Sequence, residues 1–359
     1  MSRDLTPLAY TRSADAEGEQ VGNKIHQEDD DERRPLLQNS TSATSIRQSS
    51  NNRAKKLEAT IGLGIVAFGA LFFSFSSVLI KFCGATFPPF EILLARAIVQ
   101  TVVGLASCFC FGIDPLVSRP LRPWLVLRGV VGCLAVAASN YAIAHLHFSD
   151  VSVLIYLNGA FTTLMAALVL GEPFRRFEGI CVSFCLIGAI LVSKPDFLFG
   201  TILHDHGGDN DNGGDGNSAK GLAILLAITS AFMSSITFCI IRKIGKAVHF
   251  LIYTVYYGAV TVVICIPALL TFQPFVWPQT TIEYTMLFTS GICAFIGQCF
   301  LSKGLQMTPA GPASLMSMNS LVLSFLYGVF LFGEYPDVLG VLGAIIIAVT
   351  TAALALRKK

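Results

Sequence analysis

The residues best able to do chemistry in this chain are polar groups set inside long apolar stretches. The clearest is Arg96, near the start of the run FEILLARAIVQTVVGLASCFCFGI over residues 90–113. A guanidinium keeps its proton in proteins, and placing one in hydrocarbon costs about 2.5–3.5 kcal/mol. Arg96 must therefore reach the lipid headgroups, pair with Glu91, or face a watery cavity in which it could hold an anion.

No pattern typical of catalysis or metal binding accompanies Arg96. The ten cysteines lie in or beside apolar runs without a CxxC pair, so we interpret them as free packing thiols. A GxxxxGK[ST] phosphate loop is missing from the sequence. The stretch DNDNGGDGN fails as a calcium loop because Gly213 occupies its third ligand position. We predict no catalytic residue, no cofactor and no metal.

The composition indicates a membrane protein. Of the 359 residues, 53% are hydrophobic and only 13% are charged. A soluble domain carries about 25% charged residues, so a surface that faces water throughout is excluded. The net charge of +2 gives no electrostatic basis for binding nucleic acid.

Ten apolar runs are long enough to cross a bilayer, which takes about 20 residues each. Lys and Arg gather beside these runs on the side that holds both ends of a ten-span chain, whereas the large loop LHDHGGDNDNGGDGN on the other side is acidic. The positive-inside bias therefore predicts that both termini are cytosolic. The predicted spans cover residues 61–82, 90–113, 124–144, 151–170, 177–193, 221–241, 250–271, 284–304, 312–332 and 338–356.

The spans contain an internal repeat. Gly171-Glu172 and Gly333-Glu334 are each followed by a turn and a glycine-spaced apolar helix. The number of residues from Gly129 to Gly291 equals the number from Gly171 to Gly333. We call this shared spacing the repeat offset. Each half holds five spans, an odd number, so the second copy must be inverted relative to the first. Inverted repeats are a recurring architecture of secondary transporters, with the substrate site near the bilayer midplane.

The predicted fold follows from the spans and the repeat together. It is an all-α polytopic membrane protein with ten transmembrane helices in a five-plus-five inverted repeat. Two similar halves of opposite orientation can form two conformations of comparable energy, each open to a different side. The repeat therefore favours alternating access to a site between the halves.

Several motifs carry a resemblance to a known family. They are GEPFRRFEGICVSFCLIGAILVSKPDFLFG, IIRKIGKAVHFLIYTVYYGAV, KGLQMTPAGPASLM and RAIVQ, the last spanning Arg96 to Gln100. With the five-plus-five repeat, they resemble the EamA-type branch of the drug/metabolite transporter superfamily, most closely the G-type group of solute carrier family 35. The resemblance covers about residues 60–357. It implies two EamA-type repeats, over residues 57–196 and 220–357. The polar composition predicts a disordered cytosolic tail before the first repeat (1–56) and a disordered acidic non-cytosolic loop between the two repeats (197–219).

The resemblance also points to candidate binding residues. It implies a central cavity lined mainly by the third, fourth, eighth and ninth helices, and an arginine in the second helix that suits a substrate anchor. The alternative for each polar residue is a hydrogen bond between helices, worth about 0.6–2 kcal/mol, and for Lys303 the positive-inside bias. The predicted substrate-binding set is Arg96, Asn140, Tyr141, Tyr156, Asn158, Gln298, Lys303 and Asn319.

These observations together predict a secondary transporter or exchanger of a small organic solute that works by alternating access. The intramembrane cations favour an organic anion as substrate. A nucleotide-sugar carrier, or a non-transporting membrane scaffold or regulator with the same fold, remains an alternative. The expected partners are a small-molecule substrate and the lipid bilayer, with a homodimer as a further option and nucleic acid excluded.

The polar tail carries one short linear motif. ERRPLL, over residues 32–37, matches an acidic dileucine sorting signal formed by Glu32, Leu36 and Leu37. On a disordered cytosolic segment such a signal can bind a clathrin-adaptor complex. It favours an endomembrane location, in the vacuole, the endolysosome or another secretory-pathway membrane, with the plasma membrane as the alternative.

Overall fold

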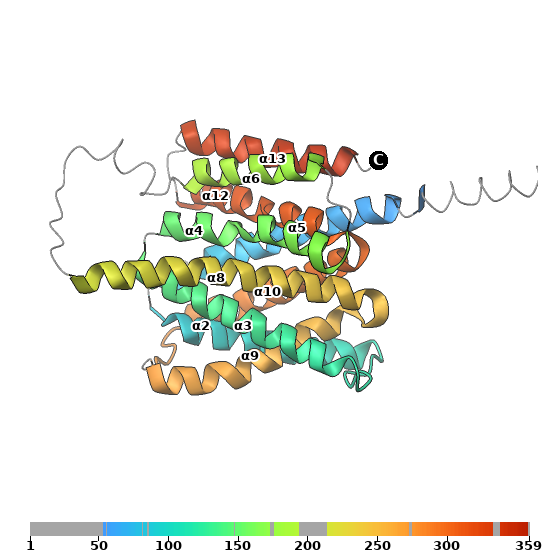
Figure 1. Ribbon diagram of the computed structural model, residues 1–359. Coiled ribbons are helices and arrows are strands. Elements are labelled where there is room, and N and C mark those ends of the chain that lie inside the picture. Colours follow the sequence, from blue (N-terminus) through green and yellow to red (C-terminus); the bar gives the residue numbers. More distant parts are fainter. Residues whose placement is uncertain are drawn as a thin grey trace, which may run out of the picture. The chain divides into compact units, whose positions relative to one another are not determined.

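The computed structural model describes residues 53–54, 56–80, 82–84, 86–146, 148–172, 176–193, 214–272, 275–332 and 338–357. The chain divides into two units, Met1–Lys56 and Leu57–Lys359, and the second holds the apolar spans. The regular elements within the described ranges are all helices (Figure 1). Glu32, Leu36 and Leu37, predicted to form a sorting signal, lie outside the described residues.

The helices follow the predicted apolar runs closely. After an N-terminal helix, Lys56–Ile80, come α2 (Pro89–Cys110), α3 (Arg122–His145), α4 (Phe148–Tyr156), α5 (Asn158–Val169) and α6 (Arg176–Ser193). The second half holds α8 (Gly214–Ile244), the short η1 (Gly245–Ala247), α9 (Phe250–Phe272), α10 (Thr281–Met307), α11 (Ala310–Ser317), α12 (Asn319–Phe332) and α13 (Val338–Arg357).

Within the described ranges, nine helical spans are long and apolar enough to cross a membrane. The ninth predicted run, 312–332, forms two helices instead of one, because α11 ends at Ser317 and α12 begins at Asn319. The fourth run is interrupted in the same way between α4 and α5, at Leu157. Counted as spans, the two halves contain five each, so the chain is an all-α polytopic membrane protein with ten transmembrane segments.

The two halves have matching element boundaries. The starts of α4 and α11, Phe148 and Ala310, are separated by the repeat offset, and so are the starts of α6 and α13. The starts of α2 and α9, Pro89 and Phe250, are separated by one position less. The spacing predicted from glycine and glutamate positions is thus reproduced by helix boundaries.

Packing contacts repeat with the halves exchanged. A Cβ added to Gly129 on α3 would lie 2.9 Å from the Cβ of Val260 on α9. A Cβ added to Gly291 on α10 would lie 2.7 Å from the Cβ of Val99 on α2. Because the two glycines are related by the repeat offset and the two valines by one position less, the same contact occurs twice with the partners swapped. This reciprocity is what a two-fold relation between inverted halves produces.

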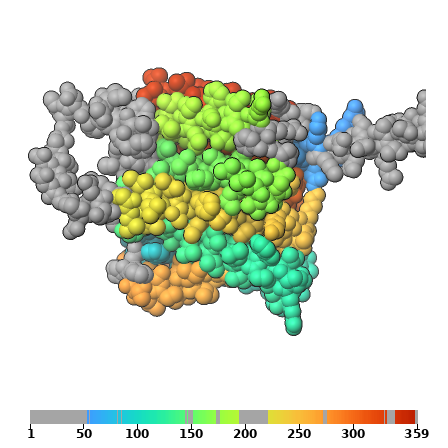
Figure 2. All heavy atoms as spheres, in the orientation of Figure 1, coloured from blue at the N-terminus to red at the C-terminus, as the bar shows by residue number. Residues whose placement is uncertain are grey.

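Helices of the two halves alternate through the bundle. Helix α6 packs on α13 at one edge, α2 packs on α9 at the opposite edge, and α8 runs between α5 and α3 (Figure 1). In Figure 2, side chains of α6, α5, α8 and α3 cover one face in succession. Large apolar side chains such as Phe330, Leu270 and Leu168 are 76–80% exposed, which suits surfaces whose solvent is lipid.

Candidate functional site

Each half contains one interrupted helix, the fourth of its five spans. At Leu157 the backbone N–H donates to the Leu154 carbonyl at 3.3 Å, and at Met318 it donates to the Leu315 carbonyl at 3.1 Å. Both are i to i−3 bonds, so each helix tightens locally, and the two interruptions occupy equivalent places in the repeat. Tightened turns inside helices often mark hinges, and discontinuous membrane helices often lie at transporter binding sites.

The largest fully buried side chain among the described residues is an arginine that the sequence reasoning missed. Arg128 on α3 is 1% exposed. Its Nη1 donates to the Tyr253 carbonyl on α9 at 2.7 Å, and its Nη2 donates to Gln298 Oε1 on α10 at 3.2 Å. The signal was present in the sequence, because Arg128 lies inside the predicted span 124–144 just as Arg96 lies inside 90–113.

A tyrosine ring links Arg128 to the arginine that the sequence did predict. The Arg128 Cζ lies 5.3 Å from the ring centroid of Tyr257 on α9. Arg96 on α2 lies near the side chains of Tyr257 and Cys293. Arg96 and Tyr257 occupy equivalent positions in the two halves, with the same spacing as the starts of α2 and α9. We refer to Arg96, Arg128, Tyr257 and Gln298 as the arginine cluster.

The arginine cluster carries positive charge without a neutralising carboxylate. Among the described residues, neither guanidinium belongs to an ion pair, and the Nε atom of each is buried without a hydrogen-bond partner. The predicted option of an Arg96–Glu91 pair is not formed, because Glu91 Oε2 accepts the Val276 backbone N–H at 3.0 Å. An uncompensated buried charge costs several kcal/mol.

Two predicted residues lie at the helix interruptions. Asn158 and Asn319 are the first residues of α5 and α12, so they correspond structurally although their spacing is one position short of the repeat offset. Asn158 Oδ1 is buried without a hydrogen-bond partner among the described residues, as is Thr162 Oγ1 one turn further along α5. The Tyr156 side chain lies close to that of Ser320, so the end of α4 is near the start of α12. Two buried polar atoms beside the interruption between α4 and α5 are therefore left without a hydrogen-bond partner among the described residues.

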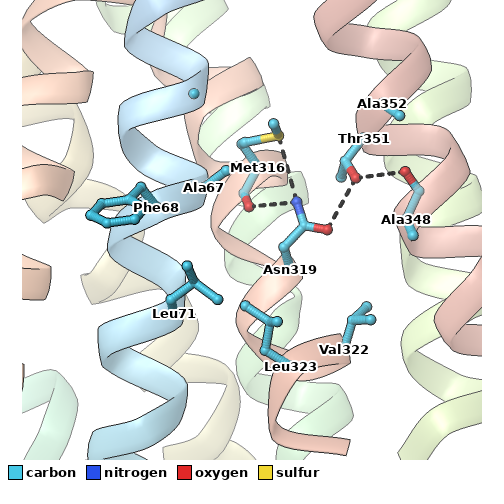
Figure 3. Close-up of a pocket in the computed structure, with 11 residues that line it drawn as sticks. Ala67, Phe68, Leu71, Met316, Asn319, Val322, Leu323, Ala348, Thr351 and Ala352 are labelled. Atoms are coloured by element: carbon cyan, nitrogen blue, oxygen red, sulfur yellow. Dashed lines mark hydrogen bonds between the residues drawn. The ribbon is translucent and has the colours of Figure 1, made fainter. Parts of the chain in front are cut away.

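Asn319 lines a separate cavity of about 510 Å³ between the N-terminal helix, α12 and α13 (Figure 3). Its Nδ2 donates to the Met316 carbonyl at 3.0 Å, and its Oδ1 accepts the Thr351 hydroxyl at 3.1 Å. Apart from these two side chains the wall is apolar, with residues such as Phe68 and Leu71. The described residues that line the cavity include no charged side chain, which distinguishes it from the arginine cluster.

The remaining predicted residues lie away from the arginine cluster. Asn140 and Tyr141 are about three turns further along α3 than Arg128, and Tyr141 is 37% exposed. The Lys303 Nζ lies 5.6 Å from the ring centroid of Phe250, the first residue of α9. Lys303 therefore lies near one end of the bundle.

One ion pair joins the two halves at the end of the bundle that holds the C-terminus of α5. Arg242 Nε on α8 donates to Glu172 Oε1 at 2.9 Å, and Glu172 Oε2 accepts the Ala310 backbone N–H at 3.0 Å. Arg242 Nη1 also donates to the Gln306 carbonyl at 3.2 Å. Glu172 therefore links Arg242 on α8 to the start of α11, and these contacts hold the two halves together at this end of the bundle.

This ion pair should be energetically coupled. A double-mutant cycle of Glu172→Gln and Arg242→Gln, measured by thermal unfolding in detergent, should give a coupling energy of about 1–2 kcal/mol because both groups are partly buried. The more exposed pair Lys246–Glu58 is the matched control and should couple by at most about 1 kcal/mol. Equal coupling in both cycles would contradict a role for Glu172 in holding the two halves together.

Comparison with known proteins gives the family. Residues 60–194 and residues 221–356 each match the EamA-like transporter family. The chain belongs to that family. The match occurs twice, once in each half, so the repeat seen in the helix boundaries is the family's own unit. Because this is a family of transporters, the chain is a transporter of small solutes. The expectation that it is not an enzyme agrees with its family.

Individual relatives extend over most of the chain. Solute carrier family 35 member G1 of Homo sapiens is 27% identical over 310 residues, covering 85% of this chain and 82% of that protein. The pseudopaline exporter CntI of Pseudomonas aeruginosa is 27% identical over 298 residues, covering 83% and 97%. An uncharacterised membrane protein of Saccharomyces cerevisiae is 28% identical over 270 residues, covering 73% of this chain, which spans 65% of that protein's length. The resemblance to the G-type group of family 35 is thus confirmed.

Proposed function

We propose that this EamA protein is a secondary transporter or exchanger of a small organic anion that works by alternating access. The observation that carries the proposal is the fully buried Arg128, which packs against Tyr257 and lacks a carboxylate partner among the described residues. A chain that only needed a packed interior would gain by replacing such a residue, because an unpaired buried charge is costly. Its presence is consistent with a charge that is neutralised during function.

The arginine cluster is suited to coupling the binding of an anion to motion of the halves. Arg96 and Arg128 come from the first half, and Tyr257 and Gln298 come from the second. An anion bound at Arg128 would take over the donors that Arg128 now gives to Tyr253 and Gln298. Exchanging these contacts changes how the halves are held together. Inverted halves of similar structure can open to either side at comparable energy.

We further propose that residues 57–196 and 220–357 act as the two moving halves, with both termini in the cytosol. The charge asymmetry between the loops supports this orientation. The dileucine motif supports an endomembrane location reached through a clathrin adaptor. A homodimer remains a separate hypothesis.

The proposal is tested with the full-length protein in proteoliposomes. The vesicles are exposed to a cell metabolite extract, and the compounds taken up are identified by mass spectrometry. Organic anions should accumulate, and Arg96→Gln should then raise the KM for the anion about tenfold or more, the value of a lost charge-assisted hydrogen bond. Arg119→Gln, at an exposed loop position, is the control and should leave the KM unchanged.

Other outcomes lead to the alternative functions. Selective uptake of nucleotide sugars would identify a nucleotide-sugar carrier. A folded protein that takes up no metabolite would support the scaffold alternative. An Arg96→Gln variant with normal affinity but reduced folded yield would assign Arg96 a structural role only.

A further inference from the structure

Each interrupted helix accepts a hydrogen bond from the other half of the chain. The Ser74 hydroxyl on the N-terminal helix lies 2.8 Å from the Ser320 carbonyl in the first turn of α12. The Ser235 hydroxyl on α8 lies 3.0 Å from the Asn158 carbonyl, at the first residue of α5. Both serines are completely buried. These contacts therefore hold the two places where the membrane helices are discontinuous.

The two contacts are equivalent under the internal repeat. Asn158 and Ser320 are separated by the repeat offset, and Ser74 and Ser235 by one position less. In each case a hydroxyl on the first helix of one half binds the carbonyl just after the interruption in the fourth helix of the other half. The glycine–valine packing contacts recur in the same way, so the two-fold relation accounts for the recurrence. These two hydroxyl contacts differ from packing contacts because each is made at a helix interruption.

Each hydroxyl has a second acceptor at nearly the same distance. Ser74 Oγ is 2.8 Å from the Ala70 carbonyl on its own helix, and Ser235 Oγ is 2.9 Å from the Ala231 carbonyl. A hydroxyl carries one proton, so it donates fully to one carbonyl at a time. When the hydroxyl rotates away from the carbonyl of the opposite half, it can donate its proton to the carbonyl on its own helix instead. Release of the interrupted helix therefore leaves no unpaired donor, which would be costly in a membrane.

We propose that Ser74 and Ser235 are paired positioning residues for alternating access, which hold and release the interrupted helices of the opposite halves. Ser235 holds α5, whose C-terminal end leads to Glu172 and the Arg242 ion pair. Ser74 holds α12, which runs from its interruption toward the other end of the bundle. Release at Ser235 favours opening at the Glu172 end, and release at Ser74 favours opening at the opposite end. This inference rests on the proposed transport function.

Amide hydrogen exchange of the full-length protein in phosphatidylcholine nanodiscs tests the positioning without any substrate. In Ser235→Ala, exchange of α5 (Asn158–Val169) should be about three- to tenfold faster while α12 stays within about twofold of the unmodified protein, as expected for losing one interhelical hydrogen bond. Ser74→Ala should give the reverse pattern. Ser230→Ala and Ser77→Ala are matched controls, because those hydroxyls donate only within their own helices. Neither control should change either segment.

The results separate this inference from the proposed function. Unchanged exchange in both serine variants, or equal acceleration of α5 and α12 in each, would overturn the positioning role. Should an alanine variant fold poorly, Ser235→Cys and Ser74→Cys preserve the volume with a weaker donor and must show the same directional pattern. Transport assays then provide the second readout, in which both variants should change the maximal exchange rate without changing the KM. The expected exchange pattern in a protein that transports nothing would refute the transport function but retain the positioning role.

Discussion

Arg128→Met will lower anion transport about ten- to a hundredfold while changing the stability of the folded protein little. Methionine removes the charge that would pair with the anion, and a hydrogen bond to a charged group is worth about 1.5–3 kcal/mol. It also removes the hydrogen bonds to Tyr253 and Gln298, a loss that is offset because the buried charge is removed as well. Stability is retained because the guanidinium is buried without a carboxylate among the described residues, and replacing an uncompensated charge by an apolar group is neutral or favourable.

The test combines initial uptake rates in proteoliposomes with thermal unfolding of the same preparations. Arg128→Lys serves as the matched variant, since it keeps the charge but lacks the planar fork that contacts Tyr253 and Gln298 together. It should retain some transport, with a raised KM. If Arg128→Met lowered the melting temperature and left the uptake per folded molecule unchanged, Arg128 would be a structural residue.

Gly343→Ala should greatly reduce the yield of folded protein. A Cβ at this position of α13 would lie 2.6 Å from the Gly188 carbonyl oxygen and 2.8 Å from the Val192 backbone nitrogen, both on α6. Backbone atoms cannot rotate away as a flexible side chain can, so the two helices must separate. Overpacking of this kind costs about 1–3 kcal/mol or more. Fluorescence-detected size-exclusion and thermal unfolding measure the loss.

The control for this prediction is Gly64→Ala on the N-terminal helix, where an added Cβ meets nothing within 4 Å. That substitution should be neutral or stabilising by up to about 1 kcal/mol, because alanine favours helix over glycine. The Gly343→Ala protein that does fold should keep an unchanged KM, since α6 and α13 contribute no residue to the arginine cluster. Equal stability of the two variants would contradict the close helix contact.

The sequence identified some of the candidate site and overlooked its centre. Arg96 and Gln298 were predicted, and the structure brings both into one cluster. Arg128 follows the same rule that selected Arg96, a permanent cation within an apolar run, but its partners Tyr253 and Gln298 are 125 and 170 residues away. The family resemblance directed attention to the third, fourth, eighth and ninth helices. The cluster instead draws on α2, α3, α9 and α10, the second, third, seventh and eighth spans.

Span number, the repeat and the family were determined by the sequence itself. The length of an apolar run, the excess of Lys and Arg beside it and the spacing of Gly-Glu pairs are properties of contiguous residues, and lipid permits few structures for such runs. The interruptions at Leu157 and Met318 were decided only by the tertiary structure, because neither residue is a proline or glycine that breaks helices by its own chemistry. Hydroxyls from the opposite half bind there, and local sequence carries no record of a partner so distant along the chain.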